Sequence, residues 1–324
     1  MKNIILKILI IGAGQIGSRH LQGAIKNKNQ LSITVVDTSQ AALKLSKKRA
    51  MEIKLGNSKT TITYKKKIPK NKIFDICIVS TNADNRAKVT IDLLNSCELN
   101  YLVFEKIVFQ KKEDFENISK ILKKKSVNAW VNCPRRTYQI YRNIKKKIDL
   151  NLPVKMEVTG SSWGMACNSI HFIDLFLYLI EDSNFRITKN NFSKKIFESK
   201  RGKNFYEISG SMKVANRKHS LLISCKIRKE NSLYVRIKNG NIENTLDENN
   251  KILIENSNGS IKSKRINVPY QSDLTGKLID SLINKRCKLV SYEISAKNHI
   301  PLLKTIKSHL SKILERELSE CPIT

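Results

Sequence analysis

The sequence predicts an α/β protein with two domains, a parallel-sheet domain followed by an α+β domain with a mostly antiparallel, open sheet. The chain has 324 residues, which suggests two domains at about 150 residues each. Up to about residue 125, short runs rich in Ile and Val alternate with longer amphipathic segments, as is typical of βαβ units. After Pro153 the pattern changes to alternating apolar and polar residues separated by turn signals, which favours hairpins. We therefore place the first domain at residues 1–130 and the second at residues 131–324.

The first domain is predicted to contain six strands joined by helices. Each strand is assigned to a short apolar run, and each helix to the amphipathic segment that follows it. The last strand leads through Pro134 into a connecting helix that ends near Asp149. The predicted strands are residues 4–11, 32–36, 62–64, 74–79, 101–104 and 127–132, and the helices are residues 15–27, 39–50, 84–95 and 111–125.

The second domain is predicted to place helices beside one sheet. A strongly apolar helix comes first, and two amphipathic helices come last. The dipeptide Asn239-Gly240 is the clearest hairpin turn between the strands. The predicted strands include residues 155–159, 206–214, 220–227, 232–238 and 251–255, and the helices are residues 166–181, 273–284 and 295–317.

The composition argues against a nucleic-acid-binding protein. The chain has 60 basic and 28 acidic residues, for a net charge of +32, but the excess is mainly Lys and is spread along the whole chain. Only 6% of residues are aromatic and no recognition motif is present, so a solvated lysine surface explains the charge and no nucleic acid is expected as a partner. The positive field would still raise the encounter rate of an anionic substrate.

The cysteines and the apolar runs indicate a cytoplasmic protein. The seven cysteines form no C-x-x-C motif and no paired spacing with His, so we expect reduced thiols and no metal site. The apolar N-terminus is interrupted by Lys7 and lacks a cleavage site, which argues against a signal peptide. No apolar run reaches the roughly 18–20 residues that a membrane span requires.

A glycine-rich loop follows the first predicted strand and opens the first predicted helix. It reads Gly12-Ala13-Gly14-Gln15-Ile16-Gly17, the G-x-G-x-x-G pattern of dinucleotide-binding loops. The first glycine allows a tight turn, the second lets the backbone approach a pyrophosphate, and the third lets the helix pack close to the sheet. Free N–H groups at the helix N-terminus would bind the pyrophosphate. We therefore expect a dinucleotide to contact Gly12, Gly14, Gln15, Ile16 and Gly17.

Asp37 predicts which dinucleotide binds. It lies about 20 residues after Gly17 at the end of the second strand, where a carboxylate can accept hydrogen bonds from the adenosine ribose hydroxyls. The same carboxylate repels a 2′-phosphate, so NAD is favoured over NADP. NADP remains an alternative, because basic residues on the next helix could reach that phosphate: Lys44, Lys47, Lys48 and Arg49.

Two later strand ends are expected at the same edge of the sheet. Ser80, Thr81 and Asn82 form a small polar loop after the fourth strand, and Glu105 and Lys106 follow the fifth. Because cofactors bind at the carboxyl edge of a parallel sheet, we expect all five to lie near the dinucleotide. A surface ion pair is the alternative interpretation of Glu105 and Lys106.

The apolar helix of the second domain carries a candidate catalytic pair. His171 and Asp174 share a helix face, and a histidine held by a carboxylate can take a hydroxyl proton as general base. A purely structural pair is the alternative. Candidate substrate-binding residues lie close by, with Arg135 and Arg136 as a possible anion clamp at the domain junction or solvated helix-start residues, and with Cys167 and Asn168 just before the histidine.

Taken together, these motifs resemble those of the Gfo/Idh/MocA family of sugar oxidoreductases over nearly the whole chain. The resemblance lies in the glycine loop with its trailing His20, in Glu105-Lys106, and in the His171-x-x-Asp174 helix start. It implies a Rossmann domain with a C-terminal α+β domain, Lys106 between nicotinamide and substrate, and His171 at the reacting hydroxyl.

Three positions depart from the family pattern. Ile107 replaces a proline, Cys167 stands where many family dehydrogenases have a catalytic Asp, and Arg86 stands where the family commonly has a His. A thiol cannot simply substitute for the carboxylate, so His171 and Lys106 would act without it, or Asn168 or Asn132 would supply a different hydrogen bond, or the chemistry has been lost.

The sequence therefore predicts an NAD-dependent oxidoreductase acting on a sugar or nucleotide-sugar, in bacterial surface-glycan biosynthesis. Dehydrogenation, ketone reduction and epimerisation share the same half-reaction and remain open. The alternative is a non-catalytic dinucleotide-binding regulator or assembly subunit. We also expect a homo-oligomer, because the exposed face of an antiparallel sheet is a natural dimer surface.

Overall fold

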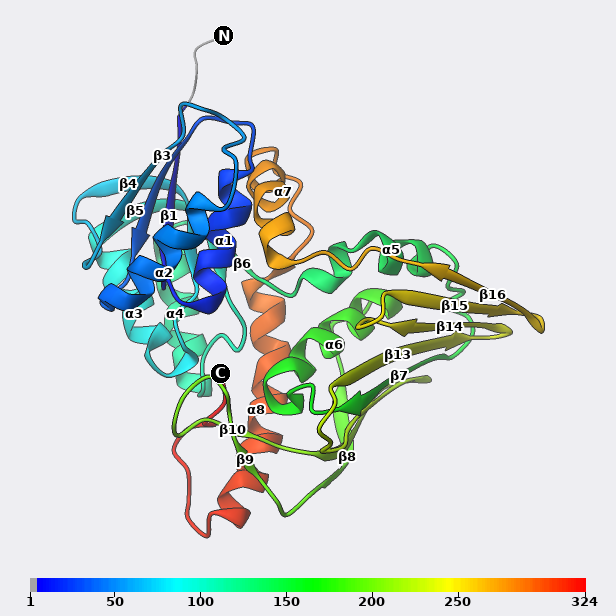
Figure 1. Ribbon diagram of the computed structural model, residues 1–324. Helices are drawn as coiled ribbons and strands as arrows, with labels where there is room; N and C mark the ends of the chain where they lie inside the picture. The colour runs from blue at the N-terminus through cyan, green and yellow to red at the C-terminus, as the bar shows by residue number, and fades with distance from the viewer. Residues whose placement is uncertain (1–4) are drawn as a thin grey trace. The chain divides into compact units, whose positions relative to one another are not determined.

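The computed structural model describes residues 5–324, which divide into two units (Figure 1). The first unit consists of the chain up to Asn132 together with the later segment Pro269–Tyr292. The second unit consists of Cys133–Val268 and Glu293–Thr324. The division near Asn132 lies close to the boundary expected at 130/131. The segment 269–292, which we expected in the second domain, folds with the first, because its helix α7 (Gln271–Ile283) buries Leu278, Ile279 and Leu282 in the core of that unit.

The first unit is built on a seven-stranded sheet in the order β17-β6-β5-β4-β1-β2-β3. All neighbouring strands are parallel except β17, which is antiparallel to β6. The strand order reverses at β1, so that the connections on the two sides of β1 run in opposite directions along the sheet. The predicted fold class is confirmed. The strands are β1 (Leu6–Ile11), β2 (Leu31–Val36), β3 (Thr61–Lys65), β4 (Lys72–Val79), β5 (Cys97–Phe104), β6 (Asn128–Val131) and β17 (Val290–Ser291). The predicted start of β1 at Ile4 lies outside the described residues.

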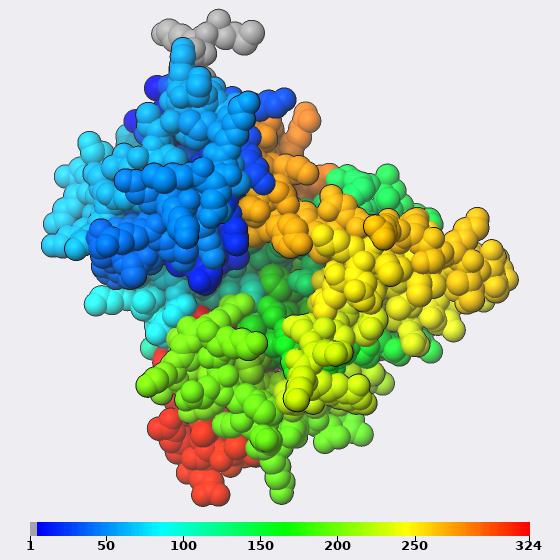
Figure 2. All heavy atoms as spheres, viewed as in Figure 1, coloured from blue at the N-terminus to red at the C-terminus, as the bar shows by residue number. Residues whose placement is uncertain are grey.

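Helices cover the sheet of the first unit. Helix α1 (Gln15–Ile25) packs against α2 (Gln40–Met51) and α7, while α3 (Ala83–Ser96) packs against α4 (Lys112–Lys124). Helix α2 begins after Ser39, whose hydroxyl accepts a hydrogen bond from the Ala42 N–H. In Figure 2, α2 lies in blue on the visible surface of this unit, consistent with a solvated face.

The second unit is built on an eight-stranded sheet in the order β16-β15-β14-β13-β7-β12-β11-β8. Neighbouring strands in this sheet are antiparallel, except that β7 and β12 are parallel. The predicted Asn239-Gly240 turn joins β13 to β14. Strands β8, β14 and β16 were not among the predicted strands, because polar residues predominate in their sequences. The strands are β7 (Val154–Ser161), β8 (Arg186–Phe192), β11 (Gly210–Asn216), β12 (His219–Cys225), β13 (Ser232–Asn239), β14 (Ile242–Asp247), β15 (Ile252–Ser257) and β16 (Ser260–Arg265).

Helix α6 (Met165–Ile180) covers one face of this sheet, over β7 and β12. The hairpin of β15 and β16 extends away from α6 (Figure 1). The predicted strand 206–214 is divided into β10 (Tyr206–Glu207), which pairs with β9 (Phe197–Glu198), and β11. The remaining elements are the short helix η1 (Pro134–Thr137), α5 (Gln139–Lys145) and α8 (Tyr292–Ile313).

Three features bear on the predicted environment of the protein. All seven cysteines are free thiols. Among residues 5–324, no helix combines the length and the apolar character needed to cross a bilayer. Within the same described range, no group of three or more His, Cys, Asp or Glu side chains is arranged to hold a metal ion.

Candidate cofactor site and active-site residues

Each of the three glycines in the loop after β1 is explained by the space around its Cα atom. Gly12 has φ +92° and lies so close to β4 that a Cβ would come within 2.8 Å of the Ser80 carbonyl carbon. A Cβ on Gly17 would lie 1.7 Å from the Gly12 oxygen, so α1 can approach the loop only without one. A Cβ on Gly14 would meet no protein atom within 4 Å. The first and third glycines are therefore needed for the fold, whereas the second leaves open space where a pyrophosphate would approach.

Asp37 links the glycine loop to the start of α2. Its carboxylate accepts hydrogen bonds from the Ala13 N–H at 2.7 Å and from the Ser39 N–H at 2.8 Å. Asp37 is half-buried, at the carboxyl end of β2 beside the loop. The predicted ribose-binding carboxylate is thus placed next to the glycine loop by the loop's own backbone.

Arg49 also reaches the glycine loop. Its guanidinium donates to the Gln15 side chain at 2.6 Å, to the Gln15 carbonyl at 3.1 Å and to the Ser18 hydroxyl at 2.7 Å. The sequence identified Arg49 only as one of four basic residues on this helix. Its contacts place it over the first turn of α1, while Lys44, Lys47 and Lys48 are exposed.

The loop after β4 is attached to the glycine loop. The Ser80 hydroxyl donates to the Gly12 carbonyl at 2.8 Å and to the Ile11 carbonyl at 3.0 Å. Thr81 is half-buried and Asn82 is exposed at the start of α3. These three residues therefore lie at the same sheet edge as the glycine loop, with Ser80 acting mainly as a structural link.

Glu105 is the centre of a buried polar network in the first unit. Its Oε1 lies 2.9 Å from His20 Nε2 and accepts a hydrogen bond from the Asn132 side-chain amide. His20 Nδ1 lies 3.0 Å from the Thr275 hydroxyl, and Asn132 also donates to Gln271 Oε1 at 2.9 Å. The network thus joins α1, the ends of β5 and β6, and α7. The carboxylate expected beside the cofactor has its partners inside the protein, while Lys106, the next residue, is itself 6% exposed.

The network lowers the pKa of Glu105. Burial alone would raise this pKa, but the hydrogen bond and charge of His20, the Asn132 amide and the nearby Lys106 charge together hold it below the ordinary value for glutamate. The ionised carboxylate is therefore the form that the fold favours.

Glu105→Gln is expected to lower the free energy of unfolding at neutral pH by about 1.5–3 kcal/mol, since a buried charge-assisted hydrogen bond is lost. A carboxyl whose folded pKa is depressed adds stability above its unfolded pKa, and this contribution disappears as the pH falls through the folded pKa. The variant should therefore lose less stability than the wild type on acidification below about pH 5. Denaturant unfolding across this pH range measures both effects. Glu98→Gln, an exposed carboxylate on the same strand, is the control, and equal behaviour of the two variants would contradict the role of the network.

The predicted catalytic residues of the second unit lie on α6. His171 is 9% exposed, but both Asp174 oxygens accept hydrogen bonds from Arg136, at 2.8 and 2.9 Å. Asp174 thus forms a bidentate ion pair with Arg136, a partner that the sequence did not indicate. Burial raises the pKa of Asp174 to about 6, although the Arg136 charge opposes this shift. Spacing along the helix correctly placed both residues on one element, but it could not identify the arginine of η1 as the partner.

Arg135 is likewise bound to a carboxylate of its own unit. Its guanidinium makes a bidentate contact with Glu248, at 2.6 and 3.0 Å, and stacks over Phe172 at 4.4 Å. The Tyr141 hydroxyl also donates to Glu248 at 2.7 Å. Burial would raise the pKa of Glu248, but Arg135 and Tyr141 together lower it. The expected anion clamp is thus two internal ion pairs, because each arginine already has a carboxylate partner.

The two residues expected to contact substrate before His171 are held by the turn that starts α6. The Asn168 amide donates to the Trp163 carbonyl at 2.8 Å, and Cys167 Sγ lies 3.5 Å from the Gly164 carbonyl. Asn168 is half-buried and Cys167 is 4% exposed. Both therefore stabilise the local turn, whatever else they contact.

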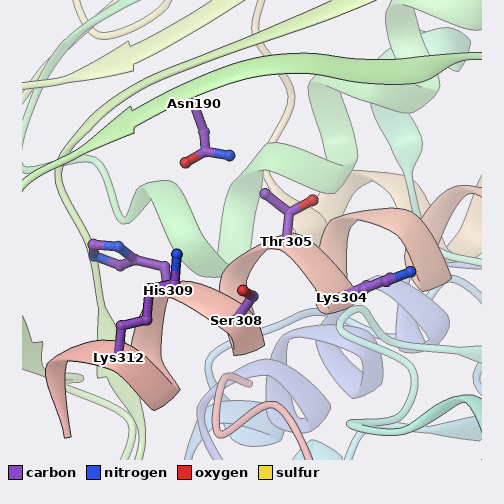
Figure 3. A pocket seen from close by; sticks show the side chains of 6 residues that line it. All are labelled: Asn190, Lys304, Thr305, Ser308, His309 and Lys312. Carbon is purple, nitrogen blue, oxygen red and sulfur yellow. The ribbon is translucent and has the colours of Figure 1, made fainter. Parts of the chain in front are cut away.

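A separate pocket of about 300 Å³ lies between β8 and α8 in the second unit (Figure 3). Two lysines and a histidine contribute to its polar lining, and none of the residues predicted to bind cofactor or substrate lines it. Its lining residues are Asn190, Lys304, Thr305, Ser308, His309 and Lys312.

Comparison with known proteins extends these observations. A family model described as an oxidoreductase family with an NAD-binding Rossmann fold matches residues 6–133. No curated protein matches the sequence. Among solved structures, the fold is similar to a dehydrogenase (MviM) from Clostridium difficile, at 16% identity and TM-score 0.70, covering 94% of this chain and 99% of that one.

Two further solved structures share the fold. One is the UDP-N-acetylglucosamine 3-dehydrogenase GnnA from Acidithiobacillus ferrooxidans, at 12% identity and TM-score 0.63, with 97% and 98% of the two chains covered. The other is an oxidoreductase from Agrobacterium radiobacter in complex with NAD+, L-tartaric acid and magnesium, at 10% identity and TM-score 0.63, with 92% and 94% covered. At these identities the similarity establishes the fold of both units.

Proposed function

Because a model of an oxidoreductase family with an NAD-binding Rossmann fold matches residues 6–133, we propose that this protein is a Gfo/Idh/MocA-type oxidoreductase that oxidises or reduces a sugar or nucleotide-sugar with NAD. The observation that carries the proposal is the loop of Gly12, Gly14 and Gly17, in which only a Cβ at Gly14 would meet no protein atom within 4 Å, so that a pyrophosphate can approach there. The exposed N-terminus of α1 and the adjacent Asp37 carboxylate complete a site that fits a dinucleotide.

In this proposal, the first unit binds and orients the cofactor. The N–H groups at Gln15 and Ile16 bind the pyrophosphate, and Asp37 accepts hydrogen bonds from the adenosine ribose hydroxyls. Ser80 maintains the shape of the glycine loop through Gly12, and Thr81 and Asn82 line the same edge. Bound oxidised NAD would accept the hydride when a carbinol is oxidised, and its reduced form would donate the hydride when a ketone is reduced.

The proton is handled by residues of the chain. His171 takes the proton of the substrate hydroxyl as the carbinol is oxidised, or returns it to the oxygen when a ketone is reduced. Lys106 orients the reacting oxygen through its ammonium group. Asp174 acts indirectly, by holding Arg136 through two hydrogen bonds.

The nucleotide-sugar substrate class is proposed by analogy with the UDP-N-acetylglucosamine 3-dehydrogenase of the same fold. A place in surface-glycan biosynthesis is a further part of the proposal. The competing function is a dinucleotide-binding regulator without turnover. The observation that favours it is the pairing of Arg135 and Arg136 with internal carboxylates, which leaves neither arginine charge uncompensated for an anionic substrate.

The test is NAD binding by calorimetry followed by absorbance near 340 nm with a panel of UDP- and CMP-sugars. A reduced-nicotinamide signal with one sugar supports the oxidoreductase. Binding of NAD without such a signal, and without isotope exchange at any sugar carbon, would establish the non-catalytic function.

Asp37→Asn is expected to shift cofactor preference from NAD towards NADP by about tenfold, because the negative charge that repels a 2′-phosphate is removed. The amide retains an oxygen that can accept one of the two backbone hydrogen bonds. Dissociation constants for both dinucleotides measure the ratio. Asp75→Asn, on β4, is the control, and an unchanged ratio in Asp37→Asn would indicate that another residue sets the preference.

We also propose that the chain forms a homo-oligomer in a reducing compartment such as the cytoplasm. The face of the second sheet opposite α6 carries charges of both signs, with Arg236 facing Glu157 and Glu243 on neighbouring strands. The free thiols support a reducing environment. Light scattering on the purified protein gives the oligomeric state, and a monomer at all concentrations would refute this part.

A further inference from the structure

Arg86 is a buried cation whose guanidinium contacts several backbone carbonyls. The residue lies on α3 and is 2% exposed. Nη1 donates to the Glu105 carbonyl at 2.8 Å and to the Val108 carbonyl at 3.0 Å, and also to the Ile107 carbonyl. Nη2 donates to the Thr81 carbonyl. One side chain therefore connects two separate segments of the first unit.

The two segments are the loops at the carboxyl ends of β4 and β5. Thr81 belongs to the polar loop after β4, and the other three carbonyls flank Lys106 after β5. Lys106 is thus restrained on both sides along the backbone. The Glu105 carboxylate is held independently by His20 and Asn132. The Lys106 segment, residues 105–108, is therefore held by hydrogen bonds to the Glu105 side chain and by hydrogen bonds from Arg86 to its backbone carbonyls.

The chemistry of the guanidinium suits this task. It carries five N–H donors in a rigid planar fork, whereas a lysine ammonium offers three donors on one atom and an imidazole at most two N–H groups. The two terminal nitrogens of Arg86 contact four carbonyls in two loops, more than the three N–H groups of a lysine could bind separately. The contact also joins two of the departures from the family pattern, because Arg86 donates to Ile107. An isoleucine lacks the fixed φ of a proline, and the hydrogen bonds of Arg86 restrain the same segment without it.

We propose that Arg86 is a positioning residue that holds the Lys106 segment and the Thr81 loop in fixed relation at the cofactor edge of the sheet. The functional consequence rests on the proposed function, because it assumes that Lys106 orients the substrate oxygen. The restraint itself can be measured without any substrate.

The experiment is competitive acylation of lysines in the complete protein, read by peptide mass spectrometry as the ratio of Lys106 to Lys112 labelling. Lys112 is an exposed internal reference in the same unit. Arg86→Lys should raise this ratio about tenfold or more, because the segment opens locally once the carbonyl contacts are lost. The increase should persist across the pH range in which the amines titrate, since it reflects access rather than ionisation.

Thr90→Val is the matched control. Thr90 lies one turn further along α3, is fully buried, and donates its hydroxyl to the Arg86 carbonyl. The substitution disturbs the same helix without removing the guanidinium, so the ratio should stay within about twofold of wild type. Should Arg86→Lys fail to fold, Arg86→His is measured in its place.

An unchanged ratio in the Arg86 variant, or an equal increase in Thr90→Val, would overturn the proposal. NAD binding of the wild type, measured by calorimetry, separates the two levels of inference. A wild type that does not bind NAD refutes the proposed function, while the labelling ratio still decides the role of Arg86. A wild type that binds NAD, together with unchanged labelling in the Arg86 variant, refutes the role of Arg86 alone.

Discussion

His171→Ala is expected to reduce turnover by about a hundred- to ten-thousandfold, the range typical of a lost general base. NAD affinity should stay close to that of the wild type, because the glycine loop belongs to the first unit and His171 to the second. The loss should therefore fall on kcat and not on the dissociation constant for NAD. Steady-state kinetics with the sugar identified by the panel, and calorimetry with NAD, measure the two effects.

A second histidine of the same unit provides the control for this prediction. His309 lies on α8 with its Nε2 3.0 Å from the Ser193 carbonyl, and His309→Gln should leave kcat within about threefold of wild type. If His171→Ala retained turnover at the level of His309→Gln, another group would have to take the proton, and the assignment of His171 as the base would be wrong.

Gly17→Ala is expected to abolish NAD binding and to destabilise the first unit. Its Cβ would lie 1.7 Å from the Gly12 carbonyl oxygen and 2.6 Å from the Ser80 hydroxyl, and the closer obstacle is backbone that cannot move without displacing β1. Overpacking of this kind costs about 1–3 kcal/mol or more. The melting temperature and the dissociation constant for NAD should both worsen.

Gly14→Ala separates binding from folding in the same loop. Gly14 has φ −68°, and a Cβ there would meet no protein atom within 4 Å, so the variant should fold as the wild type does. NAD affinity should still fall, because the added methyl group occupies the side from which the pyrophosphate approaches. If Gly14→Ala bound NAD as tightly as the wild type, the cofactor would have to bind elsewhere.

The first domain was the more predictable half of the fold. Its strands are continuous runs such as Ile8–Ile11, which are buried on both faces, and a fully apolar run signals a central parallel strand whatever follows it. In the second domain β16 could not be predicted, because all six of its residues are exposed. Such a strand forms only because β15 offers an edge with which it can pair.

The candidate site, like the fold, was predictable only in part. The positions of Gly12, Gly17 and Asp37 follow from neighbouring residues, since a strand, a tight turn and a helix within about 30 residues determine one another. The roles of Arg86 and Arg49 were not predictable in the same way. Arg86 contacts carbonyls about 20 residues further along the chain, and a backbone carbonyl has no signature in the sequence.

The sequence by itself determined the cofactor loop, its acidic residue and the two-domain order, because each depends on local chain geometry. Only the tertiary structure decided which charges are paired. With 60 basic and 28 acidic residues, each carboxylate has many possible partners, and no local pattern selects among them. In the folded protein Asp174 pairs with Arg136, 38 positions away in the sequence, and Glu248 pairs with Arg135, 113 positions away. The tertiary structure also places α7 in the first unit, because the apolar face of that helix packs against α1 and the core of that unit.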